Sequence, residues 1–164
     1  MDDEPIAALR RQHLGRAYGT DEFVPSDLDA ERDRAGLLFC AEQYGELLAS
    51  ILALPYETGL GEVACLGGPL CERAHLDNTC LEVCRFVALK AAGPRLMRES
   101  ARWCLQNTGY RRLYALVPVS LVRYYRALGL TIEAEDVAWE GASVPRRFVH
   151  GKLTDIVSAL AYLA

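Results

Sequence analysis

The fold of this 164-residue chain is decided by residues 80–117, which read CLEVCRFVALKAAGPRLMRESARWCLQNTGYRRLYALV. Residues 80–89 and 112–117 are apolar runs of strand length. Between them lies a helical pattern over 95–109, with Pro94 at the first helical position. A strand–helix–strand unit predicts two parallel strands joined by a right-handed crossover.

Apolar runs on either side of this unit predict further strands and helices. Residues 36–42 and 46–54 flank Tyr44-Gly45, a pattern that indicates a β-hairpin; one helix interrupted by Gly45 is the alternative. Elsewhere we expect helices over 6–18 and 119–128, short strands over 130–139 and 146–149, a loop over 19–34 with a short helical turn after Ser26, a loop over 55–79, and either a strand or a helix over 153–163. Together these elements predict one α/β (α+β) domain, residues 1–164, with a mixed, mostly antiparallel central sheet and helices on both faces.

The composition excludes several classes of protein. The chain is 51% hydrophobic and 24% charged, which is ordinary for a globular protein, and its net charge of -4 argues against nucleic acid as the main ligand. The N-terminus is acidic, and no apolar stretch approaches the roughly 20 residues of a membrane span, so we expect a cytoplasmic protein. Six scattered cysteines without a Cys-x-x-Cys pair predict neither a metal site nor a bound cofactor.

Residues 81–88, LEVCRFVA, carry the most specific motif. They resemble the Glu-x-Ser-Arg-Phe segment of the acyl-homoserine-lactone synthases, which have the GNAT acyltransferase fold: Glu82, Arg85 and Phe86 match, and Cys84 replaces the usual Ser or Thr. The resemblance implies that Glu82 helps to deprotonate the amine of S-adenosylmethionine, which attacks an acyl thioester, and that Arg85 and Phe86 contact this substrate. On a regular strand, Glu82 and Arg85 point to opposite faces, so they share a face only across a β-bulge. The alternative is a strand with one surface ion pair.

The N-terminal part is similar to the opening of the same family. There an arginine and two aspartates shape the S-adenosylmethionine pocket, which implies that role for Arg10, Asp29 and Asp33. An arginine of the family would fall near Leu52, and it is absent, as is a tryptophan in the early loop. These departures leave other amines open as the acceptor.

The donor side of the family's site implies a second set of residues. Val87, Ala88, Gly93 and Arg95 would contact a phosphopantetheine arm, and Met97 and Trp103 would line an acyl channel. The alternatives are a plain helix start and ordinary core residues.

Residues 123–130, RYYRALGL, resemble the end of the fourth GNAT helix. The match places Tyr125 where many members have a tyrosine that protonates the departing thiolate. Two tyrosines that only pack into the core are the alternative.

The phosphate loop of the family is incomplete in residues 90–95, KAAGPR, which favours acyl carrier protein over free coenzyme A (CoA) as the source of the thioester. Because the carrier is acidic, a basic patch should receive it. The candidates are Arg95, Arg98, Arg102, Arg111 and Arg112, for which a solvated helix face is the alternative.

Three functional hypotheses follow. The first is an acyl-homoserine-lactone synthase that uses S-adenosylmethionine. The second is an N-acyl amino acid synthase, or another GNAT N-acyltransferase, that uses a different small-molecule amine with acyl carrier protein or acyl-CoA as donor. The third is a GNAT-like domain that binds a ligand without catalysis.

Overall fold

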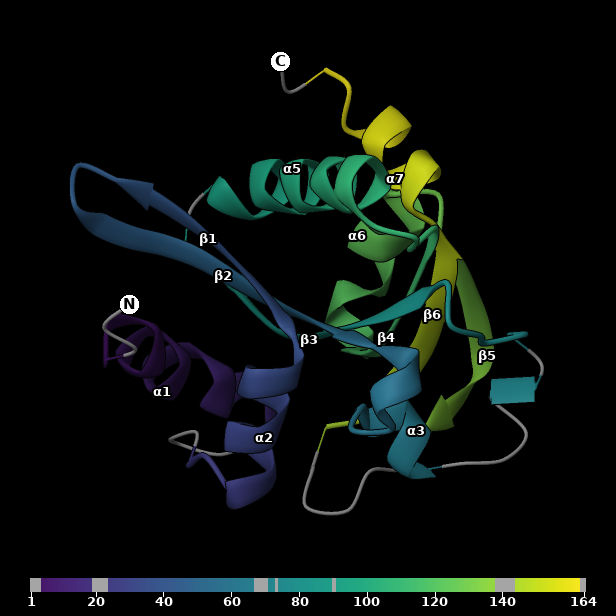
Figure 1. Cartoon of the computed structure of the whole chain (residues 1–164), viewed down its shortest axis with the longest axis horizontal. Coiled ribbons are helices and arrows are strands. Elements are labelled where there is room, and N and C mark those ends of the chain that lie inside the picture. Colours follow the sequence, from purple (N-terminus) through teal and green to yellow (C-terminus); the bar gives the residue numbers. More distant parts are fainter. Residues whose placement is uncertain are drawn as a thin grey trace.

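A mixed β-sheet forms the centre of the molecule (Figure 1). The computed structural model describes residues 4–18, 24–66, 71–72, 74–89, 91–137 and 144–162. Within these ranges the sheet has six strands in the order β1-β2-β3-β4-β6-β5. The strands are β1 (Leu37–Gln43), β2 (Glu46–Pro55), β3 (Cys80–Ala88), β4 (Arg112–Pro118), β5 (Thr131–Val137) and β6 (Arg146–Lys152). Only the β3–β4 pair is parallel, so the predicted mixed, mostly antiparallel sheet is confirmed.

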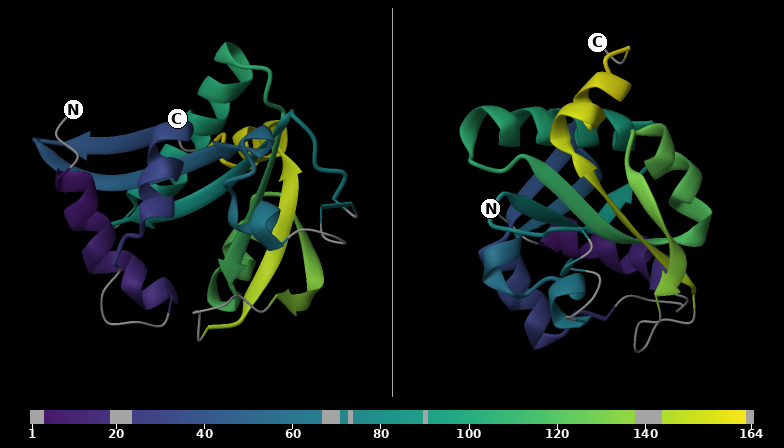
Figure 2. Two further views of the ribbon diagram at one scale, coloured as in Figure 1. Left: turned by 60° about the horizontal axis from the view of Figure 1, so that its bottom comes forward. Right: turned by 90° about the vertical axis from the view of Figure 1, so that its right-hand side faces the viewer.

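Helices cover both faces of the sheet, as predicted (Figure 2). On one face lie α1 (Glu4–Tyr18), α2 (Asp27–Ala35) and α3 (Glu62–Leu66), with the 3-10 helix η1 (Tyr56–Thr58) before α3. The other face carries α5 (Ala92–Asn107), α6 (Val122–Ala127) and α7 (Leu153–Ala159), with the 3-10 helix η2 (Val119–Leu121) leading into α6. The larger apolar core lies between the sheet and this second group, where side chains such as Ile51, Met97 and Ile156 are almost fully buried.

The hairpin β1–β2 is confirmed, and the interrupted helix is excluded. Gln43 pairs with Glu46 across a two-residue turn. Tyr44 and Gly45 both have positive φ, 53° and 79°, which is the backbone of a type I′ turn. This turn follows the right-handed twist of the two strands and therefore fixes their register.

The β3–α5–β4 unit is confirmed as a parallel crossover, but its helix differs at both ends from the prediction. The first helical residue is Ala92, two before Pro94, and the C-cap is Thr108 instead of Gly109. Thr108 ends the helix because its main-chain N–H and its hydroxyl both donate to the Cys104 carbonyl, at 3.0 and 2.6 Å. The predicted glycine cap is therefore unnecessary.

The predicted loop over 19–34 is wrong for its second half, which forms helix α2; residues 19–23 lie outside the described residues. A capping box begins this helix: the Ser26 hydroxyl accepts from the Asp29 N–H, and the Ser26 N–H donates to the Asp29 carboxylate at 2.7 Å. The helix is almost entirely polar, so it has no apolar periodicity to reveal it.

Three further segments refine the prediction. The expected loop over 55–79 contains η1 and α3, and residues 153–159 are helical instead of extended. The helix expected over 119–128 begins as η2 and becomes α-helical only at Val122. No helix of the described residues is long and apolar enough to cross a membrane, and these residues contain no cluster of His, Cys, Asp and Glu that could hold a metal ion.

Candidate active site

A bulge in β3 sets the geometry of the site. Leu52 pairs with Cys84 and Ser50 with Val87, so the single residue Ile51 faces both Arg85 and Phe86. Arg85 has φ +48°, a left-handed conformation that non-glycine residues rarely adopt. The bulge resets the alternation of side chains along the strand, and the predicted bulge is thereby confirmed.

Arg85 reaches from the bulge to α2. Its Nη1 lies 3.2 Å from Asp33 Oδ1 and donates to the Asp29 carbonyl at 3.3 Å, while its Nη2 forms an ion pair with the Asp29 carboxylate. Arg10 of α1 contacts the same Asp33 at 2.8 Å. The structure therefore brings together the four residues that the sequence assigned to the amine substrate, from three separate elements.

These charges border a cavity of about 320 Å³ between α1, α2 and β1. Arg10, Asp33 and Arg85 line it with polar groups, and Ile6 and Leu38 are among its apolar residues. A cavity with both signs of charge suits a small molecule that carries an ammonium and a carboxylate.

Sequence reasoning missed one member of this cluster, Arg32. It is buried, its Nη1 lies 3.3 Å from Asp29 Oδ1, and its Nε donates to the Leu60 carbonyl at 2.7 Å. The Ser26-x-x-Asp29 capping signature was the available signal. It predicts a helix here, and on a helix Arg32 is a neighbour of Asp29 because they are three residues apart.

Glu82 lies deeper, with 1% of its surface exposed. Its Oε1 accepts hydrogen bonds from the main-chain N–H groups of Glu62, at 2.7 Å, and Val63, at 3.3 Å. Gly61 makes this approach possible, because a Cβ at that position would lie 2.0 Å from Glu82 Oε2. Cys84 donates its thiol to Oε1 across 3.6 Å.

This environment prepares Glu82 for proton transfer. Burial, supplemented by the negative charge of Glu62, raises the pKa of Glu82 from 4.5 to about 7, although its two main-chain donors favour the ionised form. A carboxyl with such a pKa gains and loses protons at neutral pH and can act as a general base. Burial also raises the pKa of the Cys84 thiol well above its usual range, so Cys84 stays protonated.

A groove of about 480 Å³ opens where β3 and β4 separate. The two strands pair only from Cys80–Arg112 to Glu82–Tyr114, although both continue further. The groove is lined by Phe86, Val87, Ala88, Gly93, Pro94, Pro118, Ser120, Leu121 and Tyr124, with His13, Leu14 and Val144 completing it. It thus contains four of the residues that the sequence assigned to the donor side or to substrate contact.

Gly93 keeps the start of α5 close to β3. A Cβ on this residue would lie 2.9 Å from the Cβ of Ala88 and 3.1 Å from the ring of Phe86. Any larger residue would therefore push α5 away and change the shape of the groove.

The tyrosine that lines the groove is Tyr124, whereas Tyr125 points into the core with 3% exposure. Their rings meet edge to face at 5.3 Å. The Tyr124 hydroxyl is buried without a hydrogen-bond partner among the described residues, and burial raises the pKa of Tyr124 to about 12. Position 125, chosen from sequence as the proton donor, is thus one residue away from the tyrosine at the groove.

Three other predicted donor residues lie away from this groove. Met97 is in the core between α5 and the sheet. Trp103 packs edge to face on Phe39 at 5.5 Å and borders a separate groove between α5 and β1. Arg95 is exposed at the start of α5 and lines neither groove.

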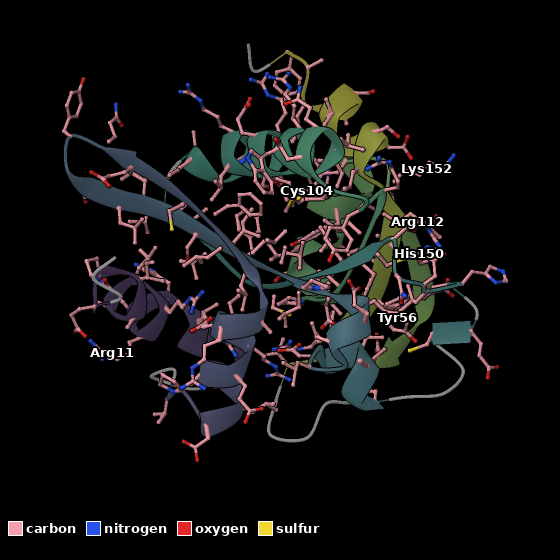
Figure 3. The ribbon with its side chains drawn as sticks, in the orientation of Figure 1. Arg11, Tyr56, Cys104, Arg112, His150 and Lys152 are labelled. Atoms are coloured by element: carbon pink, nitrogen blue, oxygen red, sulfur yellow. The ribbon has the colours of Figure 1, made fainter. Side chains whose placement is uncertain are left out.

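The expected basic patch is largely engaged in internal contacts. Arg98 is buried, pairs with Glu99 at 2.7 Å and donates to the Leu160 carbonyl, so it is not the exposed cation that we expected. Arg102 also contacts Glu99, and Arg111 donates to two main-chain carbonyls. Arg112 donates to the carbonyls of residues 74 and 75 and lies at the edge of the molecule opposite α1 (Figure 3).

Solved structures with the same arrangement of elements place the fold. BjaI, a CoA-dependent acyl-homoserine lactone synthase solved with SAM and isopentyl-CoA, superposes with a TM-score of 0.70 at 14% identity, over 98% of this chain and 80% of that one. LasI, also an acyl-homoserine lactone synthase, gives 0.64 at 15% identity over 98% and 89%. FeeM, an N-acyl amino acid synthase from uncultured soil microbes, gives 0.65 at 13% identity over 93% of both chains.

The chain has the fold of these synthases. The expected GNAT-like architecture is confirmed across nearly the whole chain. At the level of sequence, no protein-family model and no curated protein matches the chain. The synthase fold thus supplies the frame, and the chemistry is argued from the residues of this chain.

Proposed function

We propose that the protein transfers an acyl group from a thioester to the amine of a small zwitterionic molecule. The observation that carries this proposal is the arrangement along β3. A buried carboxyl, a charged cavity and an apolar groove follow one another within seven residues, from Glu82 to Ala88.

The charged cavity would hold the amine substrate. Asp29 and Asp33 attract its ammonium group, and Arg10 and Arg85 attract its carboxylate. Phe86, Val87, Ala88 and Gly93 would border the pantetheine arm and the thioester in the groove. Binding both reactants against one strand reduces the entropy that their encounter costs.

The chemical step then needs two proton transfers. Glu82, directly or through a water molecule, takes a proton from the ammonium, and the free amine attacks the thioester carbonyl. The C–N bond forms, the C–S bond breaks, and the Tyr124 hydroxyl gives its proton to the departing sulfur. With a pKa of about 12, Tyr124 is protonated at neutral pH and can donate, and solvent then restores both groups.

Within this reaction class, we place acyl-homoserine-lactone synthesis from S-adenosylmethionine first. The Glu82-x-x-Arg85-Phe86 motif on a bulged strand and the fold of BjaI and LasI support it. In that reaction the substrate's carboxylate oxygen attacks the carbon bound to its sulfonium. The C–O bond forms the lactone, the C–S bond breaks, and methylthioadenosine leaves.

An N-acyl amino acid synthase is the second candidate. Leu52 stands near the position where the first family has an arginine, and it is completely buried in an apolar cluster with Leu54 and Cys84. This replacement removes a charge that would otherwise be available for the sulfonium substrate's carboxylate. FeeM has the same fold and is described as an N-acyl amino acid synthase.

Mass spectrometry of the reaction products tests the proposal. Purified protein is incubated with S-adenosylmethionine and, in parallel, with acyl carrier protein thioesters and acyl-CoA. We expect an acyl-homoserine lactone together with methylthioadenosine. N-acyl amino acids formed only from a panel of amino acids would favour the second candidate, and no acyl transfer to any amine would contradict the proposal and leave a ligand-binding domain.

A further inference from the structure

Glu62 touches the proposed base through its main chain and lies beside it with its side chain. It is the first residue of α3, and its N–H makes the shorter of the two main-chain hydrogen bonds to Glu82, at 2.7 Å. Its own carboxylate is buried, with 7% of the residue exposed, and Arg146 Nη1 lies 3.2 Å from its Oε2. Arg146, at the start of β6, is itself 3% exposed.

Two acidic side chains are therefore buried next to each other. Burial of a charged group is unfavourable unless it is paired, so a second carboxylate beside Glu82 requires a reason. The main-chain bond from residue 62 needs no acidic side chain. A glutamine could also accept the hydrogen bond from Arg146, so the negative charge itself is the feature that packing leaves unexplained.

We propose that Glu62 is a positioning residue for Glu82: its main chain fixes the carboxylate, and its side chain, anchored by Arg146, places a negative charge beside it. The inference rests on the proposed function, in which Glu82 must accept a proton from an ammonium. A neighbouring negative charge stabilises the protonated form of Glu82, and Arg146 prevents Glu62 from accepting the proton in its place.

Other groups also act on Glu82, and each has its own element. The Cys84 thiol approaches from β3, the Tyr114 phenol from β4, Glu62 from α3 and, through Glu62, Arg146 from β6, while Arg32 of α2 and Arg85 of the bulge lie near Cys84. The two arginines of α2 and the bulge and the main-chain donors favour the ionised carboxylate. Among the described groups, Glu62 is thus the negative charge that opposes them.

Glu62→Gln tests the inference by NMR titration of side-chain carboxyl carbons, with the Glu82 signal assigned by its absence in Glu82→Gln. We expect the Glu82 midpoint to fall by about one pH unit. In the acyl-transfer assay, the acidic limb of the kcat profile should move in the same direction, with little change in KM for the amine. Glu62→Asp, which keeps the charge, should restore most of the wild-type profile, and Glu57→Gln, an exposed glutamate on η1, should leave midpoint and profile unchanged.

Arg146→Gln gives a prediction of the opposite sign, and it also serves if Glu62→Gln does not fold. Removing this cation should raise the Glu82 midpoint. A Glu82 midpoint that neither variant moves overturns the inference, whatever the activity. If the midpoints move as expected but the wild-type protein acylates no amine, the proposed function is wrong, while the charge coupling between Glu62 and Glu82 stands.

Discussion

At the scale of single residues, the site depends on close approaches that leave little room. Glu82 receives its main-chain donors only because position 61 has no side chain, and Gly93 allows the ring of Phe86 to lie against α5. The polar groups that do the proposed chemistry are buried, so their proton affinities depend on a few neighbours. Single substitutions therefore have separable effects on catalysis and on stability.

Glu82→Gln should remove the base with little change in shape. We expect kcat to fall about 100-fold or more, while KM for the amine changes little, because the charged cavity stays intact. Steady-state kinetics measures both constants, and Glu46→Gln, an exposed glutamate on β2, is the matched control. Undiminished activity of Glu82→Gln would mean that the carboxyl has only a structural role.

The two neighbouring tyrosines should differ. Tyr124→Phe removes the hydroxyl that borders the groove and should lower kcat about tenfold or more, because the leaving thiolate loses its proton donor. Tyr125→Phe removes a hydroxyl from the core and should have the smaller effect on kcat. Parallel kinetics of the two variants decides between the positions, and a larger loss in Tyr125→Phe would restore the assignment made from sequence.

Gly61→Ala should affect stability and activity together. Its Cβ would lie 2.0 Å from Glu82 Oε2, so the carboxylate or the backbone must move. We expect a loss of about 1–3 kcal/mol in the free energy of unfolding, measured in urea, and lower kcat. Gly109→Ala, where a Cβ meets no atom within 4 Å, is the control. Equal stability of the two variants would show that the close approach is unimportant.

At the scale of elements, the sequence predicted those with a clear apolar pattern. The β3–α5–β4 unit and the hairpin alternate apolar and polar residues or end at strong turn residues, and both were found. Helix α2 has no apolar stripe and depends on its capping box instead, which periodicity does not detect. The assignment of Tyr125 was displaced by one residue because η2 precedes α6, and a 3-10 turn rotates side chains by a different angle than an α-helical turn.

The capping box of α2 should influence the charged cavity. Ser26→Ala removes the acceptor for the Asp29 N–H and should lower the free energy of unfolding by about 1 kcal/mol. Because Asp29 and Asp33 lie on this helix, KM for the amine should rise more than kcat falls. Thermal unfolding and kinetics measure the two effects, and Ser158→Ala, an exposed serine on α7, is the comparison. An unchanged KM would separate the cap from the substrate site.

At the scale of the whole molecule, the candidate site joins segments that lie far apart in the sequence. The ion pairs of Arg10, Asp33 and Arg85 connect α1, α2 and β3, and the Arg146–Glu62 pair connects β6 to α3. The family motif assigned several of these residues, but Arg32, Glu62 and Arg146 became visible only through the tertiary structure. No local pattern in a sequence tells which distant arginine neutralises a buried carboxylate.

The raised pKa of Glu82 should appear in the pH dependence of global stability. Between pH 4.5 and about 7, the folded protein keeps a proton on Glu82 that the unfolded chain has lost, so stability falls as the pH rises through this window. The contribution is at most about 3 kcal/mol. Urea unfolding at pH 5 and pH 8 measures it, and Glu82→Gln should show a smaller loss between the two pH values than the wild type. Equal pH dependence in both proteins would contradict the pKa shift.

The contact between Gly61 and Glu82 also has a consequence for how this protein can diverge. A glutamate at 82 tolerates only glycine at 61, whereas a shorter residue at 82 releases that restriction. In evolution the two positions should therefore covary: lineages that lose the carboxyl can then accumulate alanine or serine at 61, and reversal becomes difficult because both changes must be undone together. The residue at position 61 would thus record whether an ancestor had already abandoned the buried acid.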